Sequence, residues 1–209
     1  LKIPTENSDA LSANSFAVDV AGFYQSEEKV YANFNGIWRA GFNIQNLGPK
    51  ITYDNDEFSS NFLPTNLKIG AGFEFIFDQD NKLTTNLELN KLLVPTPQLQ
   101  SQFTNSENKI SNDEYQKIGW VPGIFQSFGD APNGFSEEIK EITYALGAEY
   151  IYKDSFAVRT GYFHESPEKG ARKYFSLGAG FKYTTTKIDI SYLFSTSKIK
   201  NPLENTLRF

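Results

Sequence analysis

The fold of this chain is decided by the stretch LKIGAGFEFIF, residues 67–77, in which apolar and polar side chains alternate. Every second residue from Leu67 to Phe77 is apolar, and the positions between them are mainly Lys, Gly and Glu. A period of two indicates a β-strand with one apolar face, because successive side chains of a strand point to opposite sides. The stretch also has the roughly 9–11 residues that a tilted strand needs to cross a bilayer, whereas strands of soluble proteins most often have about 5–6.

The same alternation recurs along the chain and predicts nine strands. They are expected at residues 16–21, 38–45, 67–77, 83–93, 142–152, 156–162, 175–183, 187–194 and, cut short, 206–209. Aromatic residues gather at the ends of the apolar faces, as Trp38, Phe77 and Tyr183 do. This placement is typical of the aromatic girdles that flank the apolar band of a membrane barrel.

Short and long connections alternate between these strands. Short turns are expected after residues 77, 152 and 183, and longer connections after 45, 94, 164 and 194. Short periplasmic turns opposite longer extracellular loops are typical of outer-membrane barrels. A soluble β-sandwich shows the same alternation turned inside out, and it remains the alternative.

We therefore predict an all-β fold, a transmembrane antiparallel β-barrel. Residues 1–209 are expected to form a single barrel domain with a long extracellular loop insertion at 95–140. Bacterial single-chain barrels have an even number of strands. Nine strands thus predict that N-terminal strands are missing and that the chain is the C-terminal portion of a larger barrel, whose last strand continues beyond Phe209.

The composition excludes several classes of function. With 20 basic and 25 acidic residues and a net charge of −5, the chain lacks the basic excess of a nucleic-acid binder. It has no Cys and one His, which excludes disulfides, thiolate metal sites and any metal site built from two histidines. Among the remaining residues we expect no cofactor site, no metal site and no catalytic residue.

Charged residues fall on the face that would line the barrel. They are Asp19, Arg39, Lys68, Glu74, Glu88, Glu149, Arg159, Lys182 and Asp189. Their mixed signs predict structural ion pairs. One catalytic alternative is Glu88 with Glu149 as acid and base. A second is His164 as a general base, although its neighbour Glu165 would point to the opposite face of a strand, and an interfacial or loop histidine is the simpler interpretation.

The segment 95–140 is too long for an idle hairpin loop. Its second half is apolar around Pro122 and Gly123, and a helical turn is expected at Ser136. It is predicted to present aromatic side chains to a partner protein or to pack as a plug against the barrel rim. The candidate partner-binding residues are Trp120, Ile124, Phe125 and Phe128, with Phe58 and Phe62 from the preceding long loop. In that loop the acidic residues 54–57 could bind a divalent cation, although a solvated loop is the simpler interpretation.

Several long blocks of the sequence resemble one family. They are RAGFNIQNLGPK at 39–50, YDNDEFSSNFLP at 53–64, GIFQSFGDAP at 123–132, GYFHE at 161–165, GARKYF at 170–175, YLFSTS at 192–197 and NPLENTLRF at 201–209. These blocks resemble the PorV (LptO) family of the type IX secretion system in Bacteroidetes, distantly related to FadL-type transporters.

The resemblance implies a 14-stranded FadL-like barrel in the bacterial outer membrane that performs no chemistry. It implies a shuttle that binds the C-terminal domain of secreted cargo at a SprA/Sov-type translocon barrel. The shuttle then delivers this cargo to a PorU-type sortase for attachment to lipopolysaccharide, in contact with membrane lipids. The alternatives are a FadL-like channel for hydrophobic solutes and a barrel associated with lipid A deacylation, for which His164 is the best residue.

Overall fold

The computed structural model describes residues 13–52, 60–97, 112–197 and 206–209. The chain divides into two compact units. The first unit comprises residues 1–20, 44–66 and 92–138, and the second comprises residues 21–43, 67–91 and 139–209.

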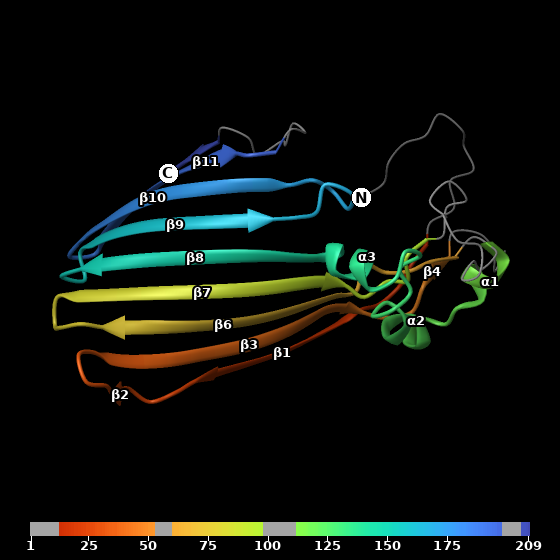
Figure 1. Cartoon of the computed structure of the whole chain (residues 1–209), viewed down its shortest axis with the longest axis horizontal. Coiled ribbons are helices and arrows are strands. Elements are labelled where there is room, and N and C mark those ends of the chain that lie inside the picture. The colour runs from red at the N-terminus through yellow and green to blue at the C-terminus, as the bar shows by residue number, and fades with distance from the viewer. Residues whose placement is uncertain (1–12, 53–59, 98–111, 198–205) are drawn as a thin grey trace. The chain divides into compact units, whose positions relative to one another are not determined.

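Strands dominate the described residues (Figure 1). They are β1 (Val18–Gln25), β2 (Lys29–Val30), β3 (Asn35–Leu47), β4 (Ile51–Thr52), β5 (Ser60–Asn61), β6 (Asn66–Ile76), β7 (Asn81–Leu92), β8 (Ile142–Tyr152), β9 (Phe156–His164), β10 (Lys173–Tyr183), β11 (Thr186–Ser195) and β12 (Leu207–Arg208). The helices are α1 (Asn112–Lys117), α2 (Trp120–Gln126) and α3 (Phe135–Lys140). None of the described helices is long and apolar enough to span a membrane.

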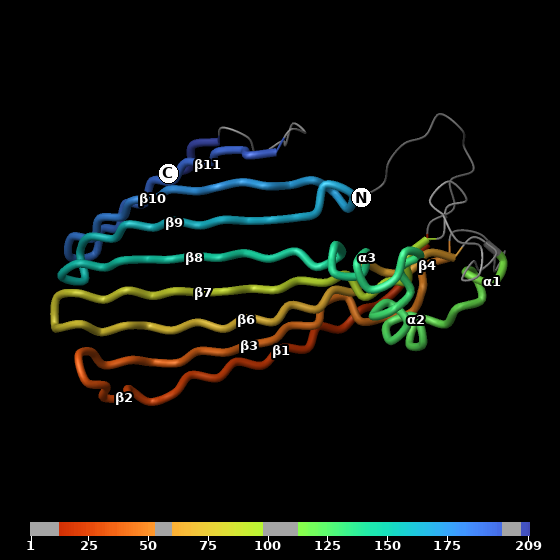
Figure 2. The backbone as a smooth tube through the Cα atoms, in the orientation of Figure 1, coloured from red at the N-terminus to blue at the C-terminus, as the bar shows by residue number. Residues whose placement is uncertain are grey.

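One sheet contains most of these strands. Its order is β1-β3-β6-β7-β8-β9-β10-β11-β12, with β2 also paired to β3, and β4 and β5 form a separate two-stranded sheet. Figure 2 shows the long strands lying side by side in chain order. The pairs from β7 to β12 are antiparallel, which confirms the predicted all-β, antiparallel fold. Among the described residues β1 and β12 are the edge strands and no pairing joins them, so closure into a barrel stays a prediction.

The predicted short turns are built from residues suited to them. Lys153 and Asp154 both have positive φ, of 52° and 48°, as a type I′ turn requires. In the turn after β6, the Asp78 carboxylate accepts hydrogen bonds from the backbone N–H of Asp80 and from the side chain of Asn81, at 2.8 Å each. The Asn81 side chain, and then the Asp80 N–H, lowers the pKa of Asp78 because both stabilise the ionised carboxylate.

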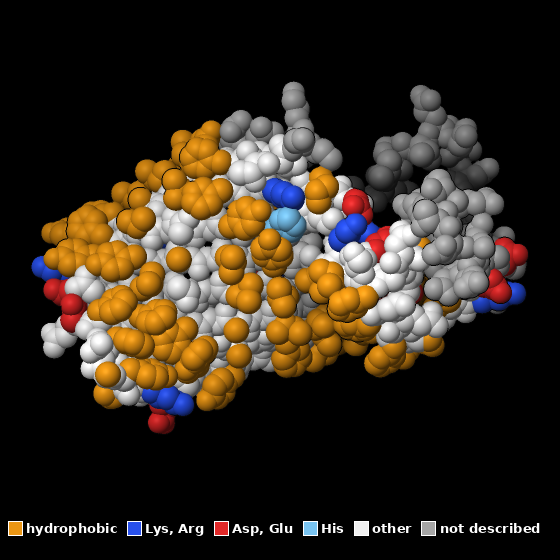
Figure 3. Space-filling model, in the orientation of Figure 1, with side chains coloured by type: hydrophobic (Ala, Val, Ile, Leu, Met, Phe, Trp, Pro, Cys, Tyr) orange, Lys and Arg blue, Asp and Glu red, His pale blue; other side chains and the backbone are white. Residues whose placement is uncertain are grey.

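One face of the sheet is apolar and exposed. Along β8 to β11 the exposed large side chains include Leu146, Val158, Leu177 and Ile190, at 46–60% exposure. They occupy alternate positions, and Figure 3 shows hydrophobic side chains spread over the face turned to the viewer. A monomeric soluble protein seldom exposes so continuous an apolar surface, and we call it the outward face.

Aromatic rings cluster at the short-turn end of this face. Trp38 packs edge-on against Phe73 at 4.5 Å, and Phe73 packs in the same way against Phe75 at 4.5 Å. Phe75 stacks on Phe77 at 6.1 Å. Such pairs stabilise by about 0.5–1.5 kcal/mol each beyond the area they bury. The predicted concentration of aromatic residues at a strand end is therefore a packed cluster in the structure.

The opposite face holds ion pairs, as predicted. Arg39 on β3 contacts Glu74 on β6 at 2.5 Å, and Arg159 on β9 contacts both Glu149 on β8 and Asp189 on β11. We call it the polar face.

The Glu88–Glu149 alternative is wrong. Thr84 is the residue of β7 opposite Glu149, and Glu88 lies four residues further along, about 13 Å away at roughly 3.3 Å per residue. Glu149 is moreover neutralised by Arg159, so the two glutamates do not form an acid–base pair.

Candidate protein-binding site

Helix α2 in the first unit is the candidate site. The sequence contains Pro122 and Gly123 here, and both residue types often interrupt a helix. Pro122 is the third helical residue, where a backbone N–H has no partner within the helix, so the missing donor costs nothing. The N–H of Gly123 donates to the carbonyl of Gly119 at 2.9 Å. The helix ends at Gln126, and the N–H of the C-cap residue Ser127 donates to the Gly123 carbonyl at 3.0 Å.

The two sides of α2 differ in exposure. Gly123 and Ser127, spaced by one helical turn, are buried, and Ser127 is fully inaccessible. On the other side Val121 and Phe125 lie one helical turn apart, at i and i+4, and Phe128 follows in the turn after the helix, two residues beyond Gln126. Their exposed fractions are 44%, 73% and 51%. We call these three residues the exposed apolar stripe of α2. Its chemistry suits a protein partner, because a cluster of exposed aromatic side chains marks interaction surfaces.

The buried side of α2 is seated on other parts of the first unit. A Cβ added at Gly123 would lie 2.8 Å from Phe62 and 3.1 Å from Pro95, so only glycine allows this close approach. The Phe62 ring packs edge-on against Tyr115 of α1 at 5.8 Å. The Tyr115 hydroxyl donates to the Pro95 carbonyl at 3.0 Å. These contacts fix the helix and present its stripe on a rigid support.

Lys50 also contributes to the contacts that support α2. The ammonium of Lys50 lies 4.2 Å from the centre of the Phe62 ring and donates to the carbonyl of Gln116 at 2.8 Å. Burial lowers the pKa of Lys50, because desolvation disfavours the charged form. The cation–π contact and the hydrogen bond tie the region around β4 and β5 to α1.

The structure sorts the predicted partner-binding residues into three groups. Phe125 and Phe128 are exposed on the stripe, whereas Trp120 and Ile124 are only half-exposed. Phe62 lies under α2 and supports it. Phe58, together with the acidic residues 54–57, lies outside the described residues.

Val121 belongs to the stripe and was not predicted. Its i, i+4 spacing to Phe125 was the available signal, and the adjoining Pro122 and Gly123 obscured it. Residues 135–140 form α3, which confirms the helical turn expected near Ser136.

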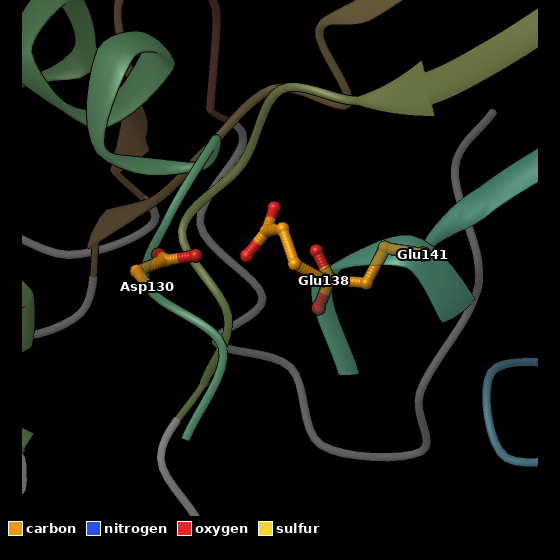
Figure 4. A group of neighbouring side chains, drawn as sticks. All are labelled: Asp130, Glu138 and Glu141. Carbon is orange, nitrogen blue, oxygen red and sulfur yellow. The ribbon is translucent and has the colours of Figure 1, made fainter. Parts of the chain in front are cut away.

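The carboxyl groups of Asp130 and of Glu138 in α3 lie close enough together to offer oxygens to one metal ion. Figure 4 shows the carboxyl groups of Asp130 and Glu138 directed toward each other. Each is bound by the protein, since Asp130 accepts from the Thr96 N–H at 2.9 Å and Glu138 from the Ala131 N–H at 3.2 Å. Glu141, also labelled in Figure 4, belongs to the second unit.

Glu141 is the centre of an ion-pair cluster in the second unit. Its two carboxylate oxygens contact Lys91 and Lys169 at 2.9 Å each. The Lys91 side chain is 8% exposed and that of Glu141 is 12% exposed, so the pairing offsets the large cost of burying either charge alone. This glutamate is a structural counter-ion.

The single histidine makes aromatic contacts. The His164 ring stacks on Tyr144 at 4.7 Å, and Nδ1 lies 3.3 Å from the Tyr162 hydroxyl. Glu165, the next residue, is instead held by two hydrogen bonds from the Arg172 guanidinium at 2.7 and 2.8 Å. As expected for neighbours in an extended chain, His164 and Glu165 have separate partners and do not form a catalytic pair.

Two comparisons with known proteins bear on the family of this chain. No curated protein matches the chain. A family model described as "Type IX secretion system protein PorV" matches residues 1–99, a range that includes β1 to β7 and the Phe62 support of α2. PorV proteins are outer-membrane components of the type IX secretion system, and a mostly antiparallel β-structure is consistent with that role. Residues 1–99, a little under half of the chain, thus match the PorV family model, which confirms the resemblance predicted from the sequence.

Proposed function

We propose that this protein is an outer-membrane shuttle of the type IX secretion system. It binds the C-terminal domain of secreted cargo through the exposed apolar stripe of α2. It takes the cargo from the SprA/Sov-type translocon and delivers it to the PorU-type sortase. The observation that carries the proposal is the stripe itself: a valine and a phenylalanine of α2, and a phenylalanine of the turn that follows, are exposed while the other side of the helix packs on Phe62 and Pro95.

The physical argument concerns the free energy of the exposed rings. Phe125 and Phe128 remain more than half exposed in the free protein. Burying such a side chain at an interface gains roughly 1.5–3 kcal/mol. Because Gly123 fixes the helix on Phe62 and Pro95, little further ordering is needed on binding. Pre-ordered aromatic anchors of this kind dominate the affinity of protein interfaces.

The polar face argues against the alternative of a channel for hydrophobic solutes. The described side chains there include Arg39 paired with Glu74, and Arg159 with Glu149 and Asp189. An apolar solute would gain nothing from contact with such pairs and would strip water from them. A shuttle needs no apolar conduit, so paired charges fit it better.

Capture of cargo by the tagged full-length protein tests the proposal. The double variant Phe125→Ser and Phe128→Ser removes the two rings and leaves the buried side of α2 intact. We expect at least a tenfold loss of affinity for a purified cargo C-terminal domain, measured by biolayer interferometry. The matched control is Phe135→Ser, which changes an equally exposed phenylalanine, at 78%, outside α2.

The control separates a defined site from general hydrophobic adhesion. Phe135→Ser should retain wild-type affinity. Equal losses in both variants, or full capture by the double variant, would show that the stripe is not the cargo site.

A further inference from the structure

A row of side chains crosses the outward face where its apolar part ends. Tyr144 on β8 lies directly opposite His164 on β9, and His164 lies directly opposite Lys173 on β10. Directly opposite residues of antiparallel strands have Cβ atoms about 4.5–5.5 Å apart. The Tyr144 and His164 rings are stacked, with 13° between their planes. We call Tyr144, His164 and Lys173 the rim row.

The cation in this row is not neutralised by a neighbouring carboxylate. Arg172, the residue before it, is paired with Glu165, and Lys140 is paired with Glu168. In the part of the chain that the structure describes, Lys173 has no ion-pair partner. A cation without a counter-ion at the edge of an apolar surface attracts an anion locally, although the protein as a whole carries a net charge of −5.

His164 adds a hydrogen-bond donor beside this cation. Its Nδ1 lies within hydrogen-bond distance of the Tyr162 hydroxyl, at 3.3 Å. When that hydroxyl donates to Nδ1, the proton of the neutral ring is on Nε2. Figure 3 shows the histidine of the chain in pale blue on the outward face, with a cationic side chain beside it and hydrophobic side chains around it. An anion at the rim row could therefore accept hydrogen bonds from both Lys173 and His164.

An apolar hollow adjoins the rim row on the same face. It has a volume of about 540 Å³, within the roughly 300–1,000 Å³ of small-molecule sites. Small side chains form its floor, since Thr85, Ala148 and Thr160 follow one another in register across β7, β8 and β9. Larger residues wall it toward the rim row: Leu87, Leu146, Tyr162 and Phe175. Trp38 and Phe73 line it as well.

We propose that the rim row and this hollow bind one phosphate-bearing membrane lipid. The phosphate group is held by Lys173 and by Nε2 of His164, and an acyl chain lies in the hollow over Thr85, Ala148 and Thr160. A cation at the edge of an apolar groove matches the amphiphilic shape of such a lipid, whose charge sits at one end of its chains. This inference rests on the outer-membrane location of the proposed function but not on cargo binding.

Fluorescence quenching tests the site directly in detergent-solubilised full-length protein. Trp38 lines the hollow, and Trp120 is the second of the two tryptophans, so a Trp120→Phe background reports on Trp38 alone. The probe is phosphatidic acid with brominated acyl chains, which quench tryptophan on contact. The comparison is brominated diacylglycerol, which lacks the phosphate. We expect half-maximal quenching at a concentration at least tenfold lower for phosphatidic acid, a difference of about 1.4 kcal/mol, because its phosphate accepts charge-assisted hydrogen bonds.

Variants of two lysines on the same strand locate the effect. Lys173→Gln should abolish the preference for phosphatidic acid, and Lys173→Arg should retain it. Lys182→Gln is the matched control, because Lys182 also lies on β10 but on the polar face at the short-turn end. It should leave the preference unchanged. Inorganic phosphate should compete only weakly, because it lacks the acyl chain.

Each other outcome overturns the proposal. Equal quenching by the two lipids would show that the hollow is only part of a general lipid-facing surface. Equal effects of Lys173→Gln and Lys182→Gln would show a diffuse charge effect. Strong competition by inorganic phosphate would show an ion site without a lipid. Cargo capture by Lys173→Gln should be normal, so failure of the lipid site and failure of the cargo site are distinguishable.

Discussion

Arg159 on β9 and Asp189 on β11 are joined by an ion pair that passes over the intervening strand β10. On β10, Gly178 is the residue opposite Arg159 and Gly180 is the residue opposite Asp189. Neither glycine carries a side chain that would block the guanidinium. The same guanidinium donates to Glu149 on β8, so one arginine links three strands of the polar face.

Removal of Arg159 should destabilise the sheet. Arg159→Met leaves two carboxylates without their shared counter-ion. We expect a loss of about 1–3 kcal/mol in unfolding free energy, less than for a fully buried pair because these side chains are about one-third exposed. Urea unfolding of the full-length protein in detergent, followed by circular dichroism, measures the loss. Lys82→Gln is the control, because its partner Asp154 is 70% exposed, and an unchanged Arg159→Met would contradict the structural role.

A methyl group at Gly180 should have a similar effect. A Cβ there would lie 2.5 Å from a carboxylate oxygen of Asp189 and 2.8 Å from Nη1 of Arg159. Gly180→Ala must therefore shift the ends of these two flexible side chains, and we expect a loss at the lower end of the same range, about 1 kcal/mol. At Gly147 on β8 nothing lies within 4 Å of the added Cβ, so Gly147→Ala should be neutral or slightly stabilising. The two variants are compared by the same unfolding measurement, and equal midpoints would refute the steric argument.

The strands could be predicted from the sequence because their signal is local. From Leu67 to Phe77 a strict period of two fixes both the strand and its apolar face, and β6 spans Asn66–Ile76. The two-residue strands β2, β4 and β5 were missed, since two residues cannot show a period. The sequence also could not predict which charged residues would form ion pairs. Arg159 is thirty residues from Asp189, and only the register of the sheet brings them together.

The candidate site could be predicted only in part, because contacts between residues remote in sequence decide which side of α2 is exposed. Phe125 and Phe128 could be chosen because they belong to the apolar second half of a segment that is too long for an idle hairpin loop. Which side of α2 would be buried depends on Phe62 and Pro95, which are remote in sequence and contact Gly123. That contact turned Phe62 from a predicted binding residue into a support. The rim row could not be predicted either, because only strand pairing brings Tyr144 and Lys173 next to His164.

The loop between β9 and β10 should depend on pH through Glu165. Arg172 lowers the pKa of Glu165 below its ordinary value of 4.5, because its side chain and backbone N–H bind the ionised carboxylate. A lowered pKa means that the pairing stabilises the loop above about pH 4.5 and that this stability is lost as the pH falls through the lowered value. We expect Glu165→Gln to reduce hydrogen-exchange protection of residues 165–172 about tenfold at pH 7.

The pH dependence of the same measurement provides the control. At a pH below the lowered pKa the wild type should match Glu165→Gln. Glu168→Gln should have little effect at either pH, because the Lys140–Glu168 pair is exposed on both sides. A protection difference between wild type and Glu165→Gln that persists in acid would show that the carboxylate charge is not the cause.

The seat of α2 should control cargo binding without any change to the exposed stripe. Gly123→Val places side-chain atoms where Phe62 and Pro95 lie within 3.2 Å of the added Cβ, so the helix must move away from its support. We expect a several-fold loss of cargo affinity in biolayer interferometry, together with faster hydrogen exchange in residues 120–127. Gly129→Val is the matched control, because nothing lies within 4 Å of a Cβ there. Normal cargo affinity in a Gly123→Val protein with loosened α2 amides would mean that the rings bind without needing a rigid helix, and it would remove pre-ordering from the proposed mechanism.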